Sequence, residues 1–350
     1  MKRNEGFGLM KALVYIGPQE LEMHDKEIPE PRAAEAIIRV ASVGICGSEL
    51  EGYMGHSSVR TPPLVMGHEF CGIVDQLAPD VTGLHAGDKV VANPLIACGS
   101  CDRCRLGKPN LCRNRQIVGI HRPGAFAEYV AVPAANLYPV PASMDTDLAS
   151  LAEPLAVCLH AVKIGLRPFQ NLIIYGAGPI GLLTLQAAQA MGAQRVLVIE
   201  KQLERRAFAK QLGAETAAPD MTLEASRTLF GQHGVDTIID CVGVQPTREQ
   251  AMQLVNPGGT VVMVGLGQDL TKLPLNHLVR QEVAIIGSYT YSDEDFGQAV
   301  SLLTNGKISG GDWMTACHLP SAPAVFAALT EGRTKFSKYI IHPHGEGRQP

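Results

Sequence analysis

The chain has 350 residues, 46% of them hydrophobic, and a formal net charge of −4. This length exceeds what one hydrophobic core usually supports, so we expect two domains. No basic stripe accompanies the charge, and no apolar run is long enough to span a bilayer, which argues against nucleic acid or membrane as a partner. The cysteine count is nine, an odd number that argues against a fully paired disulfide framework. We therefore expect a cytoplasmic protein.

The pattern of short apolar runs divides the chain in two. Residues 1–9 contain no secretory signal and are expected to be a disordered extension. From residue 10 to about 150, β-type runs are separated by Gly and Pro, which predicts a compact, mainly antiparallel, barrel-like domain. From residue 172, apolar strands alternate with helical segments, which predicts an α/β, doubly wound parallel sheet. A helix, a strand, a second helix and a final strand follow residue 292, and residues 344–350 are expected to be a disordered tail.

Four cysteines lie within fifteen residues, separated by two, two and seven residues: Cys98, Cys101, Cys104 and Cys112. Four thiolates can complete a tetrahedral shell around one Zn²⁺ with no open position, so such a site is structural. Two disulfides or an iron–sulfur cluster are the alternatives. The spacing and the reducing compartment favour zinc.

A glycine-rich turn follows the apolar strand that ends at residue 175 and opens the next helix. Its G-x-G-x-x-G motif runs through Gly176, Gly178, Pro179, Ile180 and Gly181. The first glycine permits a tight turn, the second lets a pyrophosphate approach the backbone, and the third lets helix and strand pack closely. The helix N-terminus offers free N–H groups to the phosphates. The motif therefore predicts a dinucleotide site.

An acidic residue, Glu200, ends the next strand at the distance expected for an acid that binds the adenosine ribose. A carboxylate there repels a 2′-phosphate, so NAD is favoured over NADP. Lys201, Arg205 and Arg206 follow. These cations could hold a phosphate, with Arg205 as the candidate cofactor contact, but a solvated helix face is the favoured interpretation of them.

A second group of possible metal ligands is spread along the chain. Cys46 and His68, with Glu69 and Glu153, could supply an incomplete zinc shell that leaves one position to water or substrate. Spacing alone does not show that these four residues converge.

With these motifs in order, residues 10–343 resemble the zinc-dependent medium-chain alcohol and polyol dehydrogenases. The G-H-E-x-x-G signature of that family is matched from Gly67 to Gly72, and the four cysteines and the glycine loop fall where the family carries structural zinc and NAD. The resemblance implies a GroES-like catalytic domain over 10–156 and 293–343, with the zinc lobe at 94–113. It implies a Rossmann domain over 157–292.

The resemblance also implies two zinc ions per chain, the catalytic one held by Cys46, His68 and either Glu69 or Glu153. The Glu153-Pro154 pair is the form seen in sorbitol, galactitol-phosphate, threonine and butanediol dehydrogenases. Two positions depart from the family. Glu49 replaces the usual Asp, and Glu51 replaces a relay histidine, so Glu51 or His56 becomes the substitute candidate.

The predicted reaction is oxidation of a polyol or secondary alcohol to the ketone, with hydride transfer to NAD. Ser48, two residues from Cys46, is the candidate to accept the hydroxyl proton, and Tyr53 and Arg60 are candidate substrate contacts. Lys338 matches a family position near the cofactor phosphates, with a solvated surface lysine as the alternative. The remaining cysteines are expected to be buried thiols: Cys71, Cys158, Cys241 and Cys317.

Other substrates and one other class of protein stay open. Within enzymes these are a threonine-type amino alcohol dehydrogenase and a cyclitol or sugar-phosphate dehydrogenase. A zinc-stabilised NAD-binding sensor without catalysis is the non-enzyme alternative. By resemblance, we expect a homodimer or homotetramer that pairs through the strands at 260–265 and 283–288.

Overall fold

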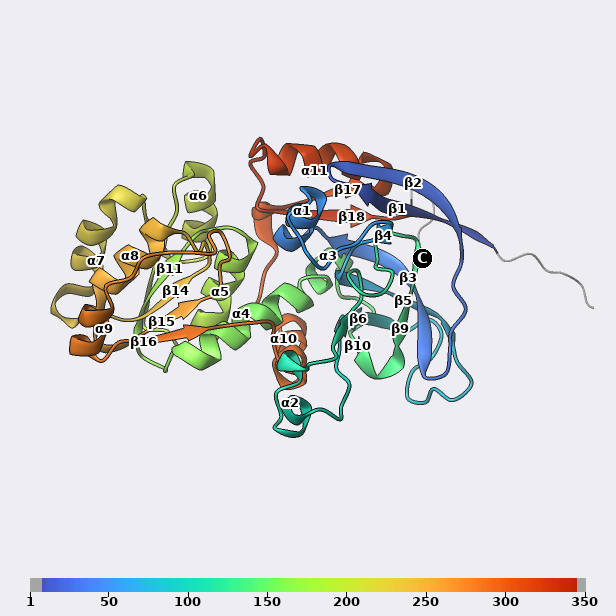
Figure 1. Ribbon diagram of the computed structural model, residues 1–350, viewed down its shortest axis with the longest axis horizontal. Coiled ribbons are helices and arrows are strands. Elements are labelled where there is room, and N and C mark those ends of the chain that lie inside the picture. Colours follow the sequence, from blue (N-terminus) through green and yellow to red (C-terminus); the bar gives the residue numbers. More distant parts are fainter. Residues whose placement is uncertain (1–7, 345–350) are drawn as a thin grey trace, which may run out of the picture.

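The structure is a computed structural model that describes residues 8–344, and it consists of two lobes joined side by side (Figure 1). Residues 1–7 and 345–350 lie outside the described part, as does most of each predicted disordered end. The predicted extension is wrong at its last residue, because β1 (Leu9–Gly17) begins at Leu9. The predicted tail is wrong at its first residue, since His344 Nδ1 lies 3.5 Å from a carboxylate oxygen of Glu128.

The first lobe is built on a seven-stranded sheet in the order β10-β6-β5-β3-β18-β17, with β9 also paired to β3. All pairs are antiparallel except β17–β18, so the mainly antiparallel prediction is confirmed. The strands are β3 (Glu35–Gly44), β5 (Glu69–Leu77), β6 (Lys89–Ala92), β9 (Tyr129–Pro133), β10 (Leu137–Pro139), β17 (Met314–His318) and β18 (Lys338–His342).

A smaller sheet, β2-β1-β4, covers this lobe, with β2 (Glu20–Glu27) and β4 (Leu64–Val65) on either side of β1. β2 was not identified from the sequence, because most of its side chains are polar and exposed. Charged side chains of this kind are typical of an edge strand that avoids pairing with another molecule. Its pairing with β1 across a short turn is what makes it a strand.

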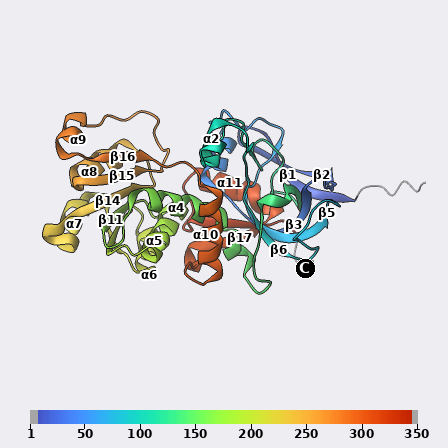
Figure 2. The same cartoon turned by 90° about the horizontal axis from the view of Figure 1, so that it is seen from below.

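Short helices and the metal lobe complete the first unit. They are α1 (Gly47–Tyr53), α2 (Asp102–Arg105), α3 (Thr146–Ala149) and α11 (Ala322–Thr330), with the two-stranded pair β7 (Leu95–Ile96) and β8 (Gln116–Ile117) beside α2. Viewed from below, α2 and its loop project away from the main sheet (Figure 2).

The second lobe is a six-stranded parallel sheet in the order β13-β12-β11-β14-β15-β16. This is the doubly wound dinucleotide-binding order, in which the chain reverses direction at the first strand. Its strands are β11 (Asn171–Tyr175), β12 (Arg195–Ile199), β13 (Glu215–Ala217), β14 (Val235–Asp240), β15 (Val255–Met263) and β16 (Ala284–Gly287).

Alternating side chains of β11 show that both faces of this sheet are covered. Leu172 and Ile174 are buried with the helices α4 (Ala152–Gly165) and α5 (Pro179–Ala190), whereas Ile173 and Tyr175 are buried in a separate cluster on the opposite face. The other helices are α6 (Leu203–Gln211), α7 (Thr222–Phe230), α8 (Gln245–Leu254), α9 (Leu275–Gln281) and α10 (Asp293–Thr304). The predicted fold class, a GroES-like β domain with a Rossmann domain, is confirmed.

Candidate active site and metal centres

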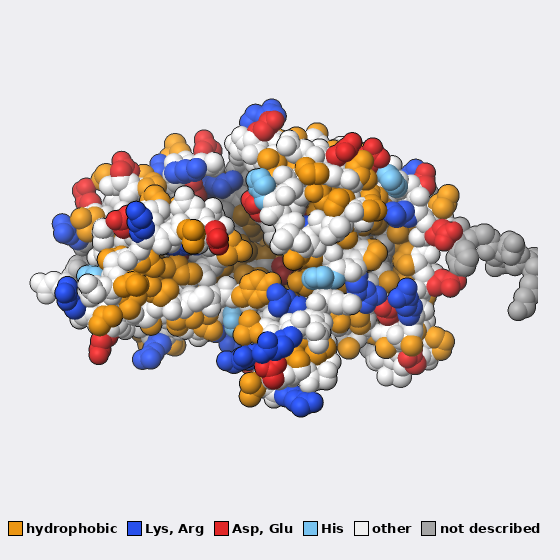
Figure 3. Space-filling view, in the orientation of Figure 1, with side chains coloured by type: hydrophobic (Ala, Val, Ile, Leu, Met, Phe, Trp, Pro, Cys, Tyr) orange, Lys and Arg blue, Asp and Glu red, His pale blue; other side chains and the backbone are white. Residues whose placement is uncertain are grey.

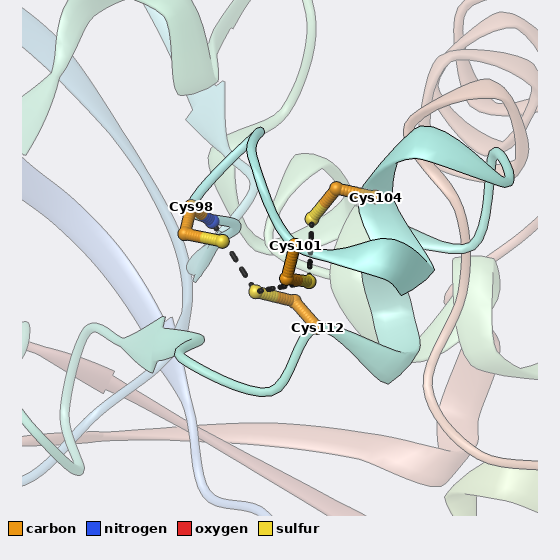
Figure 4. Close-up of side chains that lie close together, drawn as sticks. All are labelled: Cys98, Cys101, Cys104 and Cys112. Carbon is orange, nitrogen blue, oxygen red and sulfur yellow. Dashed lines mark hydrogen bonds between the residues drawn. The ribbon is translucent and has the colours of Figure 1, made fainter.

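The four clustered cysteines converge in the structure. Their sulfur atoms all lie within 4.8 Å of one another. Cys101 Sγ is 3.5 Å from Cys104 Sγ and 3.9 Å from Cys112 Sγ (Figure 4). A tetrahedral zinc with bonds of about 2.3 Å places its sulfur ligands about 3.8 Å apart, while a disulfide requires about 2 Å. The donor set therefore fits zinc and does not fit disulfides.

The backbone around these sulfurs favours the thiolate form at Cys98, whereas burial and the neighbouring sulfurs raise the pKa of Cys104 to about 12. The backbone N–H of Cys98 donates to Cys112 Sγ over 3.3 Å. Backbone N–H donors lower the pKa of the Cys98 thiol to about 6, and thiolate is the form that binds metal. Arg113 and Asp102 form a two-bond ion pair across the same loop.

Three of the four residues predicted for the catalytic metal also converge. One ligand atom from each of Cys46, His68 and Glu69 lies within 4.8 Å of the others. Cys46 follows β3 and caps α1, Glu69 is the first residue of β5, and His68 directly precedes that strand. The antiparallel register pairs Gly44 with Glu69, which brings the end of one strand against the start of the other. Strand pairing therefore assembles residues that are more than twenty positions apart.

Glu49 hydrogen-bonds to His68 and to the backbone next to this trio. Its side chain is fully buried, with Oε1 2.8 Å from His68 Nδ1 and accepting from the Gly67 N–H, and Oε2 accepting from the Cys46 N–H. Burial raises the pKa of this carboxyl, but His68 and Arg60 outweigh that effect and lower it. When Nδ1 donates to Glu49, Nε2 is left to bind a metal, an arrangement typical of zinc-binding histidines. At this position the departure from Asp was the one feature of the sequence that pointed to such a role.

Lys338 lies beside Glu69. Its side chain is buried, and Nζ donates to Glu69 Oε2 and, over 3.0 Å, to the Ile45 carbonyl. Gly44 leaves room for this pair, because a Cβ there would lie 2.6 Å from Glu69 Oε2. The solvated-surface alternative for Lys338 is therefore wrong. A contact with the cofactor phosphates stays a prediction, and in this structure the ammonium group is engaged with Glu69.

Glu153, from the first turn of α4, is buried near the trio, but Tyr291 holds it. The Tyr291 hydroxyl donates to Glu153 Oε1 over 2.9 Å. Burial raises the pKa of Glu153 to about 7, opposed by His68. In this arrangement Glu69 is the acid closer to Cys46 and His68. Tyr291 was not identified from the sequence, since nothing near it in the chain marks it as a partner of Glu153.

Ser48 lies next to the trio. Its hydroxyl donates to Cys46 Sγ over 3.3 Å and accepts from Arg60 Nη2 over 3.0 Å. Glu51 and His56 instead pair with each other on the surface, 3.4 Å apart, with about two thirds of each side chain exposed. Tyr53 is buried and packs edge-on against Phe326, so it belongs to the core.

The glycine loop has the predicted strand–turn–helix form. It joins β11 to α5, whose first residue is Pro179, and Ile180 packs against the core of the lobe. Gly176 has φ +93°, and a Cβ on Gly181 would lie only 1.8 Å from the Gly176 carbonyl oxygen. A Cβ on Gly178 would meet nothing within 4 Å. That open side of the loop can receive a pyrophosphate.

Glu200 links this loop to β12. Its carboxylate accepts from the Ala177 N–H and the Gln202 N–H, each over 2.9 Å, and the side chain is almost fully buried. Arg206 donates to the Glu200 carbonyl. Arg205 is partly buried, and its Nε makes no hydrogen bond to any residue in the described part of the chain.

The metal trio and the glycine loop meet where the two lobes join. Ser337, which precedes Lys338, donates from Oγ to the Ala177 carbonyl of the loop over 3.2 Å. The surface is hollowed between the two lobes (Figure 3). The ligand trio and the glycine loop therefore lie near the same junction between the lobes.

Comparison with known proteins agrees with this site. The alcohol dehydrogenase GroES-like domain matches residues 32–142, and the zinc-binding dehydrogenase domain matches residues 179–305. The L-galactonate-5-dehydrogenase of Escherichia coli strain K12 is 34% identical over 326 residues, which cover 92% of this chain and 94% of that protein. The chain belongs to the zinc-binding alcohol dehydrogenase family. It is an oxidoreductase, and its resemblance to the medium-chain dehydrogenases is confirmed.

Solved structures support the same family. A zinc-binding dehydrogenase from Sinorhizobium meliloti 1021, bound to NADP, superposes with a TM-score of 0.89 at 33% identity, covering 96% of this chain and all of that one. The galactitol-1-phosphate dehydrogenase of Escherichia coli gives 0.88 at 30% identity, covering 95% of this chain and all of that one. Within residues 8–344, no helix is long and apolar enough to cross a membrane.

Proposed function

We propose that this dehydrogenase oxidises a secondary hydroxyl group of a polyol to the ketone and transfers the hydride to NAD. The observation that carries the proposal is the incomplete ligand trio of Cys46, His68 and Glu69 at a cleft shared with the glycine loop. Three protein ligands and an open position are typical of a catalytic zinc, in contrast to the closed four-sulfur site.

In this proposal Cys46, His68 and either Glu69 or Glu153 hold the catalytic zinc, which supplies Lewis-acid stabilisation of the negative charge that develops on the substrate oxygen. Glu49 fixes the tautomer and orientation of His68. Lys338 holds Glu69, and Tyr291 holds Glu153, so each acid has a second partner when it is not a ligand.

Ser48 is the proposed proton acceptor for the substrate hydroxyl, since its Oγ is 3.3 Å from Cys46 Sγ. Arg60 cannot take the proton onward, because a guanidinium group stays protonated. The proton therefore has to leave Ser48 to an acceptor other than Arg60.

We propose NAD as the cofactor, with Gly176, Gly178, Pro179, Ile180 and Gly181 receiving the pyrophosphate. Glu200 supports this choice, because a buried carboxylate fixed by two N–H groups disfavours a 2′-phosphate. The NADP-bound relative is the contrary observation, and Arg205 is the cation through which this chain would accept NADP. Titration of NADH and NADPH into the wild-type enzyme decides between the two cofactors. NADH should bind more tightly than NADPH, and E200Q should reduce this difference in affinity.

The test of the reaction is NADH formation from polyols, sugar acids, sugar phosphates, cyclitols, threonine and simple alcohols, before and after chelator treatment. Chelator-sensitive oxidation of a polyol class supports the proposal, and C46S should abolish it while C317S, at a cysteine outside both metal groups, should not. Silence from enzyme that carries both zincs and binds NADH contradicts it for these substrates. Silence with one zinc per chain favours a sensor without catalysis.

We also propose a cytoplasmic homodimer or homotetramer that pairs through β16. This strand is the edge of the parallel sheet, and large exposed apolar side chains lie near it in the chain: Leu266, Leu270, Leu275 and Val279. Light scattering on the wild type and on I286K measures the assembly, and a monomeric wild type would contradict the proposal.

A further inference from the structure

A buried arginine lies one hydroxyl group away from the catalytic metal ligands. Arg60 is 6% exposed, in the segment between α1 and β4. Its Nη2 donates to Ser48 Oγ over 3.0 Å, and Ser48 in turn contacts Cys46 Sγ over 3.3 Å. A substrate group bound to Arg60 would therefore lie close to the metal ligands. The same substrate molecule could then also supply the reacting hydroxyl.

The protein makes room for this side chain. A Cβ on Gly52 would lie 2.5 Å from Arg60 Cδ, so only glycine lets the arginine stem cross the face of α1 at this point. Glycine inside a helix costs about 1 kcal/mol relative to alanine. Gly52 lacks the positive φ that would otherwise require glycine. The close approach of Arg60 accounts for it.

The guanidinium has fewer partners than its burial calls for. Within residues 8–344, Ser48 is its hydrogen-bond partner, no Asp or Glu forms an ion pair with it, and its buried Nε has no hydrogen bond. Glu49 is close enough for its pKa to respond to Arg60, but both its oxygens are taken by His68, Gly67 and Cys46. A buried charge without a paired anion is costly, and the planar guanidinium fork matches a carboxylate.

We propose that Arg60 binds a carboxylate of the substrate, so that the enzyme acts on a polyhydroxy acid in preference to a neutral polyol. This inference rests on the proposed function and names the substrate class of the same site. Arg60 is then a specificity-determining residue, which anchors one end of the substrate while a hydroxyl further along the carbon chain reaches the metal.

A carboxylate fits better than a phosphate ester because the other cationic groups nearby are not available. Lys338 is engaged with Glu69. Burial lowers the pKa of His121, and the charges of Arg115 and Arg60 lower it further, which favours the neutral imidazole. Arg115 itself donates to the Cys112 carbonyl and the Tyr289 hydroxyl. His56 pairs with Glu51 on the surface. One guanidinium matches the single charge of a carboxylate, whereas a phosphate dianion calls for a second cation.

The experiment compares kcat/KM of the zinc-loaded enzyme for aldonates, alditols and alditol phosphates of matched chain length and configuration. The wild type should prefer the aldonate over the alditol by roughly 10²–10³-fold, the usual effect of truncating one partner of a buried charged pair. R60Q should reduce this ratio of kcat/KM values to near one, mainly by raising KM for the aldonate. R60K should retain part of the preference, because lysine keeps the positive charge but lacks the planar guanidinium fork. G52A is the matched second variant: it displaces the guanidinium without removing it and should also lower the ratio.

Three outcomes overturn the inference. The first is an equal kcat/KM of the wild type for aldonate and alditol. The second is an equal loss of kcat/KM on both substrates in R60Q. The third is a higher kcat/KM of the wild type for the alditol phosphate. An equal loss would mean that Arg60 only orients Ser48. If no substrate is oxidised, the proposed function fails separately, and calorimetry with a carboxylic acid that lacks the reacting hydroxyl still tests Arg60. Binding to the zinc–NADH enzyme that disappears in R60Q supports the inference, and equal binding refutes it.

Discussion

Replacing Glu49 by glutamine tests whether this buried carboxylate holds the catalytic metal site together. The amide is nearly isosteric, so the core around α1 stays filled. Its oxygen can still accept from Gly67 N–H or from His68, but its NH₂ group then faces the Cys46 N–H, which donates to Glu49 in the wild type over 3.0 Å. One buried donor loses its acceptor, and His68 loses its charged partner.

The hydrogen bonds of Glu49 determine how much stability and zinc affinity E49Q should lose. A buried N–H without an acceptor costs about 1–3 kcal/mol, so E49Q should be less stable by that amount. Removal of the carboxylate partner of a metal-binding histidine typically weakens metal binding about 10–100-fold. Because Glu49 does not contact the four-cysteine group, the loss should be confined to one of the two zinc ions.

The assay is zinc content per chain after dialysis against graded chelator, read together with thermal unfolding. E49Q should release one zinc at a chelator concentration that leaves both in the wild type. E51Q is the matched control, since Glu51 lies two residues away on the same helix and is largely exposed. If E49Q retains both metals as the wild type does and unfolds at the same temperature, the supporting role of Glu49 is wrong.

Three further predictions test other parts of the structure. C112S removes a buried sulfur of the four-cysteine group, so metal analysis should show loss of one zinc and limited proteolysis should show cleavage within 94–113. G181A places a Cβ against the Gly176 carbonyl, and the overpacking should weaken NADH binding by roughly tenfold or more in a fluorescence titration. D147N removes the negative charge beside His342 Nε2 and Ser42 Oγ but keeps one acceptor oxygen, so it should cost about 1 kcal/mol or less, because the pair is partly exposed.

The Asp147–His342 pair also predicts how stability depends on pH. The hydrogen bond to Asp147 raises the pKa of His342, so its contribution is complete below the ordinary histidine pKa and is lost as pH rises through the raised value. Burial raises the pKa of Asp147, but hydrogen bonds from His342 and Ser42 outweigh this and lower it, so its contribution is lost only as pH falls through the lowered value. The difference in melting temperature between wild type and D147N should be largest at mildly acidic pH, and a constant difference would contradict this.

The features that the sequence predicted are those that depend on local pattern. The glycine loop, the four cysteines and the alternation of strands and helices after residue 172 each occupy a short stretch, so periodicity and spacing identify them. β2 was missed for the same reason, because a polar strand has no apolar pattern and is defined only by its neighbour β1.

The partners of the site residues depend on tertiary packing and could not be read in this way. Glu49 differs from the usual residue at its position by one methylene group, yet only the structure shows that it contacts His68 and the backbone on both sides. Tyr291 and Glu153 are 138 positions apart in the chain. Such contacts form where elements from distant segments pack, and no spacing rule covers them.

β18 shows why these distant contacts matter for function. Ser337 and Lys338 are consecutive, but Ser337 hydrogen-bonds to the glycine loop of the cofactor lobe and Lys338 binds Glu69 in the metal site. Because the two side chains share one stretch of backbone, the glycine loop and the partner of a metal-site acid are held by adjacent residues. The start of β18 thus connects the cofactor lobe with the metal-site residues, and the ion pair with Glu69 provides the buried Lys338 ammonium group with a partner.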